Sequence, residues 1–102
     1  MPFVDFRQLR QELDCREVLT RHGWEPTRRE PASWRGPCPF HGSRTPHSRA
    51  LSVARAGFHC FSCHARGDVI AIYQLVYRLD AYRAALLLAA DFGIPTGHTL
   101  IV

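Results

Sequence analysis

Two short pairs of residues constrain the fold of this chain most strongly. Cys38 and His41 are separated by two residues, and Cys60 and Cys63 have the same spacing. Two ligands at this spacing can reach one ion from a single tight turn, and a second such turn completes a tetrahedral site. Because thiolates and imidazole are borderline-soft donors, the pattern predicts one structural zinc ion rather than magnesium or calcium.

Other readings of the cysteines explain fewer residues. Cys60, Cys63 and His64 also match the C-x-x-C-H motif of c-type haem attachment, and Cys60 with Cys63 alone could be a redox pair. Haem attachment expects an exported protein, and a redox pair expects a βαβ context that the sequence does not indicate. Both readings leave Cys38 and His41 without a role, so the zinc site remains the better hypothesis.

The remaining histidines and the fourth cysteine are weaker candidates for metal ligands. His59 would point away from its neighbour Cys60 on a strand, and His64 would have to distort the turn. His47 is expected to be a solvated loop residue. Cys15 lies on a predicted helix, where a free cysteine usually behaves as a small buried hydrophobe.

The size of the chain also favours a metal site. One hundred and two residues make one small domain, and 46% hydrophobic with 22% charged residues is ordinary for a folded soluble chain. A domain this small buries a limited share of its surface, so a zinc site, on the order of 10 kcal/mol, would stabilise it strongly. We expect a single zinc-finger domain over residues 1–96 and a tail over 97–102.

No segment of the sequence resembles a targeting or membrane element. The first twelve residues are charged, and the longest apolar run, Ala84–Ala90, is far too short to cross a bilayer. We therefore expect a cytoplasmic protein without a membrane partner. In a reducing compartment, cysteines favour metal binding over disulfides.

Hydrophobic periodicity and capping residues predict helices at both ends of the chain. Phe6, Leu9 and Leu13 fall on one face of a short helix. Further helices are expected over Cys15–His22 after Asp14, from Asp68 as helix cap to Leu79, and from Asp80 to Phe92.

The proline-rich middle of the chain predicts short strands instead of helices. The candidate strands are Trp24–Arg28, Ser33–Arg35, Leu51–Ala54 and Gly57–Phe61. The last two flank Arg55-Ala56, which favours a hairpin with Gly57 near the turn. These elements predict an α+β fold in which a small antiparallel sheet is flanked by N- and C-terminal helices.

The charge of the chain is concentrated in its middle. The net charge is +4, and all thirteen basic residues are arginine. Residues 28–66 hold seven of these arginines and one acid, Glu30, whereas each flank has a slight excess of acids. Codon usage in a GC-rich genome can explain arginine in place of lysine, but it does not explain the clustering. A basic block of this kind indicates an anionic partner.

Arginine and aromatic residues in this block are the candidate contacts to nucleic acid, because guanidinium groups bind phosphates and aromatic rings stack on bases. For Trp34, Phe58 and Phe61 the choice between core packing and stacking stays open, whereas Phe40 is better explained as core. The proposed DNA-binding residues are Arg35, Arg44, Arg49, Arg55, Phe58, Phe61 and Arg66.

Five motifs together resemble the zinc-binding domain of bacterial DnaG-type DNA primases, over about residues 14–94. They are Gly36–His41, Arg44–Pro46, Leu51–Val53, Phe58–Cys63 and Gly67-Asp68. The resemblance implies a zinc-ribbon-like sheet, one structural zinc, and recognition of single-stranded template DNA during RNA primer synthesis. It carries the zinc ligands over to Cys38, His41, Cys60 and Cys63, the basic residue before Thr-Pro to Arg44, and the helix start to Gly67 and Asp68.

The sequence departs from the family pattern at several positions. His47–Arg49 is an insertion relative to the usual pattern, Leu51 replaces an aromatic residue, and His64 stands where a small residue, often glycine, is common. The catalytic module of the family, with its magnesium-binding acidic cluster, is a separate unit. This chain has no visible catalytic centre and would contribute to primase activity only together with such a module.

Two functions from different classes follow. The first is a zinc-stabilised domain that binds single-stranded DNA. The alternative is a zinc-dependent protein-interaction module that docks a replication or regulatory partner, through its sheet or its C-terminal helices. A primase catalytic module or a replicative helicase is the expected protein partner.

Overall fold

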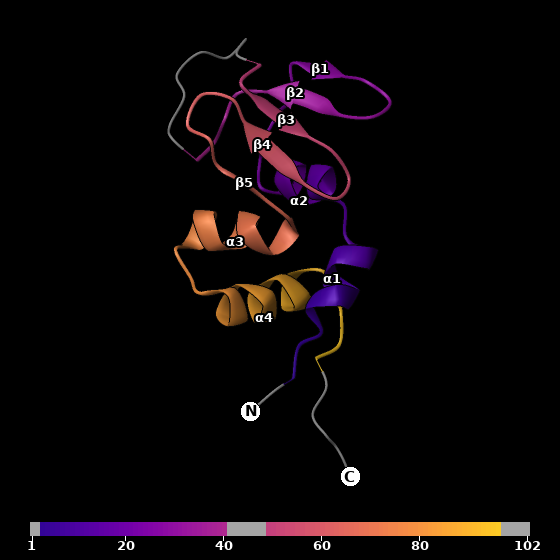
Figure 1. The fold of residues 1–102 in the computed structure, drawn as a ribbon. Helices are drawn as coiled ribbons and strands as arrows, with labels where there is room; N and C mark the ends of the chain where they lie inside the picture. The colour runs from indigo at the N-terminus through magenta and orange to yellow at the C-terminus, as the bar shows by residue number, and fades with distance from the viewer. Residues whose placement is uncertain (1–2, 41–48, 97–102) are drawn as a thin grey trace.

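The computed structural model describes residues 3–40 and 49–96, which form an α+β fold as predicted (Figure 1). Two short helices come first, five strands follow, and two helices end the described chain. The helices are α1 Phe6–Glu12, α2 Cys15–Arg21, α3 Val69–Tyr77 and α4 Ala81–Asp91. The strands are β1 Arg28–Arg29, β2 Trp34–Gly36, β3 Leu51–Val53, β4 Phe58–Cys60 and β5 Arg66–Gly67.

The five strands form one antiparallel sheet in which spatial order follows chain order. The predicted hairpin is confirmed, since β3 and β4 pair and the Ala54 N–H donates to the Gly57 carbonyl at 2.8 Å. In Figure 1 the sheet occupies one end of the molecule, with α2 behind it, while α1, α3 and α4 form the other end. The β-meander therefore leaves one face of the sheet turned away from the helices.

The strand prediction was wrong at two places. The strand expected over Trp24–Arg28 forms only at Arg28–Arg29, because Trp24 instead buries its ring and donates its indole N–H to the Pro37 carbonyl at 2.6 Å. Strand β5 was missed, since two residues carry no alternation that could reveal a strand.

Each of the four helices begins after an aspartate whose carboxylate accepts backbone N–H groups. Asp14, Asp68 and Asp80 were predicted caps, and Asp5 is a further one. Helix α3 ends at Tyr77, two residues before the predicted end, because Arg78 takes the left-handed conformation at φ 56°.

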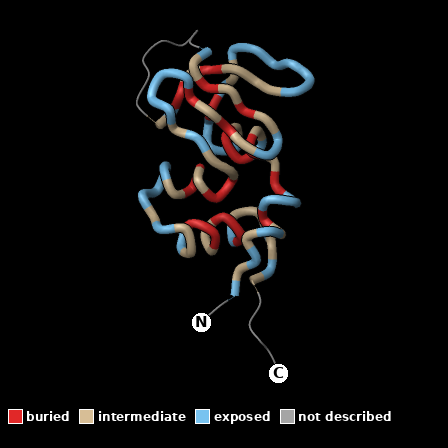
Figure 2. Tube along the Cα trace, viewed as in Figure 1, coloured by how far each residue is buried: buried red, intermediate tan, exposed pale blue. Residues whose placement is uncertain are grey.

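The core lies where the helices meet one another and the inner face of the sheet (Figure 2). Leu9, Val18, Ile72 and Leu88 are fully buried there, one from each helix. Val76 continues the apolar stripe of α3 beyond Ile72 and Tyr73, but it is 41% exposed because the described residues leave the last turn of α3 uncovered. No helix within the described ranges is long and apolar enough to cross a bilayer.

Candidate metal centre and nucleic-acid interface

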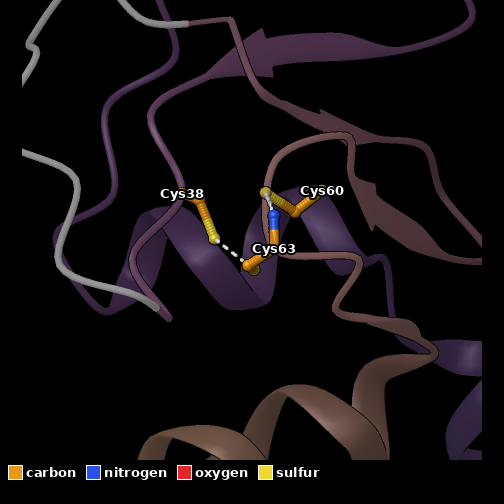
Figure 3. A group of neighbouring side chains, drawn as sticks. All are labelled: Cys38, Cys60 and Cys63. Carbon is orange, nitrogen blue, oxygen red and sulfur yellow. Dashed lines mark hydrogen bonds between the residues drawn. The ribbon is translucent and has the colours of Figure 1, made fainter.

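Three of the four predicted zinc ligands converge on one point (Figure 3). Cys38 follows β2, Cys60 ends β4, and Cys63 lies in the turn after β4. Their sulfur atoms all lie within 4.8 Å of one another, and the Cys38 and Cys63 sulfurs are 3.8 Å apart. Tetrahedral zinc with Zn–S bonds of about 2.3 Å separates its sulfurs by about 3.8 Å, so this donor set fits that ion. His41, the fourth predicted ligand, lies outside the described residues.

The turn after β4 is shaped to stabilise a thiolate at Cys60. The backbone N–H groups of Ser62 and Cys63 both donate to the Cys60 sulfur at 3.4 Å. Although burial raises the pKa of Cys60, these N–H groups lower it below the ordinary value. The turn closes at His64, whose backbone is left-handed at φ 66° and whose N–H donates to the Cys60 carbonyl. This conformation explains why glycine is common at that position in the family pattern.

Cys38, which follows β2, is almost fully buried. Burial is the main cause that raises the pKa of Cys38 to about 12, so without a metal this thiol holds its proton at neutral pH. A bound zinc ion replaces such a proton, because metals take thiolates as ligands.

Trp24 supports the segment that carries Cys38. Its indole N–H holds the Pro37 carbonyl, and its ring packs so closely on Gly36 that a Cβ there would lie 2.7 Å from the ring. Sequence reasoning missed this role. The signal available was Gly36 itself, because a glycine inside a strand often marks close approach by another group.

The weaker ligand candidates lie elsewhere. His59 points to the opposite face of β4 from Cys60, as predicted, and within the described residues neither His59 nor His64 joins the cysteine cluster. Cys15 is fully buried away from the cluster, and its pKa is raised to about 12, mainly by burial. In the described ranges, the three cysteines are the one cluster of at least three potential metal ligands. His47 lies outside those ranges.

The sheet brings distant arginines into one row on its exposed side. Each of these residues lies directly opposite the next one on the neighbouring strand: Arg28, Arg35, Ser52, His59 and Arg66. We call the face that they share the outer face. Paired residues on neighbouring strands share a face, so these five side chains project together. Phe58, the neighbour of His59 on β4, points to the opposite, inner face and is 5% exposed.

Phe61 extends this row just beyond β4. Its ring is 58% exposed, the Arg35 guanidinium lies 5.2 Å from its centroid, and the His59 ring lies 4.6 Å away. Arg35 also donates to the Arg49 carbonyl, which places Arg49 beside the same end of the sheet.

Other predicted DNA-binding residues are separated from the outer face. Phe58 packs against Phe40 in the core, with ring centroids 5.1 Å apart. Arg55, in the β3–β4 turn, donates to the Gln11 carbonyl of α1. Trp34 is not among the proposed DNA-binding residues, and the sequence leaves the choice between core packing and stacking open for it; it lies on the inner-face side, where Arg16 and Arg29 approach its ring. Arg44 lies outside the described residues.

The Asp68 helix cap is confirmed by its contacts. Its carboxylate accepts from the N–H groups of Ile70 and Ala71 at 3.0 Å and from the Arg10 guanidinium at 2.7 Å. Burial alone would raise the pKa of Asp68, but these donors lower it below its usual value. The cap thus ties α1 to the start of α3, directly after the sheet.

Comparison with known proteins agrees with this geometry. Residues 3–100 match the family described as the CHC2 zinc finger. The chain is 33% identical to the DNA primase of Aquifex aeolicus over 89 residues, which cover 87% of this chain and 17% of that protein. It is 39% identical to the DNA primase of Rickettsia felis over 66 residues, covering 65% of this chain and 11% of the relative.

A solved structure shows the same architecture. The crystal structure of the Aquifex aeolicus primase, with its zinc-binding and RNA polymerase domains, superposes with a TM-score of 0.70 at 29% identity. The match covers 91% of this chain and 22% of that one. This chain spans less than a fifth of the curated primases described above. The cysteine geometry and these matches establish that the chain belongs to the CHC2 zinc-finger family of DNA primases and carries one structural zinc ion.

Proposed function

We propose that this chain is the template-recognition domain of a primer-synthesising system and binds single-stranded DNA on the outer face of its sheet. The observation that carries the proposal is the in-register row of Arg28, Arg35 and Arg66 beside the exposed ring of Phe61. A basic groove or face with exposed aromatic rings suits single strands, because phosphates and unstacked bases are bound together.

The charge and contacts of the row support this proposal. Within the described residues Arg66 makes no ion pair, and Arg28 makes one exposed pair with Glu30 at 3.4 Å. Arg35 donates to a backbone carbonyl and makes no ion pair with any residue in the described ranges. These guanidinium groups can therefore exchange counterions for phosphates when a strand binds.

Zinc has a structural role in this proposal. Cys38, His41, Cys60 and Cys63 would hold the ion and so fasten the segment after β2 to the turn after β4. Four protein ligands leave no open position for a substrate, so the ion supplies folding energy and no reaction chemistry. In this proposal residues 1–96 act as one domain and residues 97–102 are its tail. The domain works in the cytoplasm beside a primase catalytic module.

Fluorescence anisotropy with a labelled single-stranded oligonucleotide tests the DNA-binding proposal. The zinc-loaded chain should bind at low salt, and the logarithm of the affinity should fall linearly with the logarithm of salt concentration. Arg35→Gln should reduce that slope by about one, whereas Arg83→Gln on α4 should leave it unchanged. The proposal fails if there is no binding at low salt, or if binding does not depend on salt.

A second candidate function has its own observation. Leu75, Val76 and Tyr77, in the last turn of α3, are each more than 40% exposed. Leu75 and Val76 line a groove of about 840 Å³ together with Trp24 and Phe40. An apolar patch of this kind suits a protein partner, here a primase catalytic module or replicative helicase.

Val76→Arg separates the two candidates. It should abolish stimulation of primer synthesis by a separately supplied catalytic module while leaving oligonucleotide binding unchanged. Equal stimulation by the variant and the original chain would remove this second candidate.

A further inference from the structure

The outer face is not uniform along the row of Arg28, Arg35, Ser52, His59 and Arg66. At the β1–β2 end it carries two arginines in succession. At the β4–β5 end the surface has a shallow, open hollow of about 590 Å³. Ser52, His59 and Arg66 line this hollow together with the backbone at Gly57 and Gly67. The two ends therefore offer a strand different contacts.

Two glycines at the hollow bring the backbone of neighbouring segments close together. A Cβ on Gly57 would lie 3.0 Å from the Gly67 carbonyl oxygen, so the start of β4 and the end of β5 approach closely there. Gly67 has φ 155°, and a Cβ at this position would lie 2.3 Å from the Ala71 side chain. A side chain at Gly67 is therefore strongly disfavoured on the inner side of the sheet, where Gly67 pairs with the buried Phe58. Gly57 permits the close approach of the two strands beside the hollow.

The side chains around the hollow can form hydrogen bonds in a fixed arrangement. Ser52 pairs with His59 and His59 pairs with Arg66, so the three span two strand spacings, about 9.6 Å. They supply a hydroxyl group, an imidazole ring and a guanidinium fork. Because the fork has donors only, it favours a group that presents two adjacent acceptors, as guanine does with O6 and N7.

An aromatic path leads into the hollow. The His59 ring lies against Phe61 with an interplanar angle of 31°, close to a stacked arrangement. A strand with one base on Phe61 would thus bring its neighbouring base over His59 and towards Arg66.

We propose that Ser52, His59 and Arg66 form a seat that reads one base of the bound strand and favours guanine. Arg28 and Arg35 at the other end hold phosphates irrespective of sequence. This inference rests on the proposed single-stranded DNA binding and assigns base selection to a particular part of the face.

Affinities for a set of related oligonucleotides test the seat. The probes are thymidine 12-mers in which one central position is thymine, adenine, cytosine, guanine or an abasic site. The zinc-loaded chain should bind the guanine probe on the order of 10-fold more tightly than the abasic probe. Arg66→Lys keeps the charge but removes the fork, so this preference should disappear while the salt dependence is retained. Ser52→Ala and His59→Ala should weaken the preference.

Arg28→Gln is the matched control, since it lies in the same row at the opposite edge of the sheet. It should weaken binding of all five probes by one common factor and leave their ratios unchanged. Zinc content and circular dichroism confirm that each variant is folded. If the ratios survive Arg66→Lys, or if Arg28→Gln changes them equally, the seat is refuted while DNA binding stands. If the original chain binds none of the probes, the proposed function itself is refuted.

Discussion

The two faces of the sheet differ sharply although their residues alternate along the same strands. On the inner face Leu51, Val53 and Cys60 are fully buried and Phe58 nearly so. On the outer face the paired residues are Arg28, Arg35, Ser52, His59 and Arg66. The inner face and the metal site therefore serve stability, while the outer face is available for binding. Substitutions on the inner face should therefore lower the stability of the fold, whereas substitutions on the outer face should weaken DNA binding.

The largest expected effect comes from the metal site at the edge of the inner face. Cys60→Ala should remove stoichiometric zinc binding and abolish cooperative thermal unfolding, because a structural zinc contributes on the order of 10 kcal/mol, similar to the stability of a small domain. Zinc content by mass spectrometry and circular dichroism melting measure this. Cys15→Ala, a buried cysteine outside the cluster, should retain one zinc ion. Unchanged zinc binding in Cys60→Ala would contradict the assignment.

The next largest effect is a difference in stability between variants at two neighbouring residues of β4. Phe58→Ala should lower the free energy of unfolding by about 3–5 kcal/mol, because it leaves a cavity against Phe40 in the core. His59→Ala, on the outer face, should change it by no more than about 0.5 kcal/mol. Urea denaturation of both zinc-loaded variants gives the two values. Similar losses for both would mean that the outer face is also part of the core.

A smaller effect should appear in DNA binding without loss of stability. Phe61→Ala should weaken binding of a single-stranded oligonucleotide by about 1–3 kcal/mol, since one stacking platform is lost. Phe3→Ala is the matched control, because Phe3 is similarly exposed, at 62%, but precedes α1. Anisotropy titrations compare the two, and equal losses would remove Phe61 from the interface.

The smallest effect concerns the helix cap that follows the sheet. Asp68→Ala should cost about 1 kcal/mol of stability, whereas Asp68→Asn should cost less because asparagine is an equally good cap. The folded pKa of Asp68 is lowered, so its contribution is present above the unfolded value near 3.9 and is lost as the pH falls through the folded pKa.

The free energy of unfolding, measured between pH 7 and pH 2, tests whether the contribution of Asp68 is lost as the pH falls. The stability of Asp68→Asn should fall less steeply with acid than that of the original chain. A steeper fall in the variant would contradict the role of the Arg10 contact.

The sequence was sufficient for features that depend on local spacing. The Cys38–His41 and Cys60–Cys63 pairs predicted the zinc site, and the aspartate before each apolar helical stripe predicted three of the four helix starts. The β3–β4 hairpin was likewise readable from its turn. Each of these depends on residues close together in the chain, where the physical rules are short-ranged.

Features that depend on strand register could not be predicted. The alignment of Arg28 with Arg35 and of His59 with Arg66 needs the pairing of β1 and β5, two-residue strands without a recognisable pattern. The contact of Trp24 with Gly36 and Pro37 joins segments whose approach is decided by packing. The burial of Phe58 likewise depends on which face of β4 packs against the core, and the sequence does not decide that.

Nuclear magnetic resonance of the arginine side-chain Nε–H groups tests the central claim most directly, because all thirteen basic residues are arginine. A single-stranded oligonucleotide is titrated into the zinc-loaded chain, and the shift of each signal is followed. If the strand lies on the outer face, the shifts should be large for Arg28, Arg35 and Arg66 and small for Arg16, held by Asp14, and Arg83 on α4. Shifts centred on Arg16 or Arg83, with Arg35 and Arg66 unchanged, would contradict binding on the outer face.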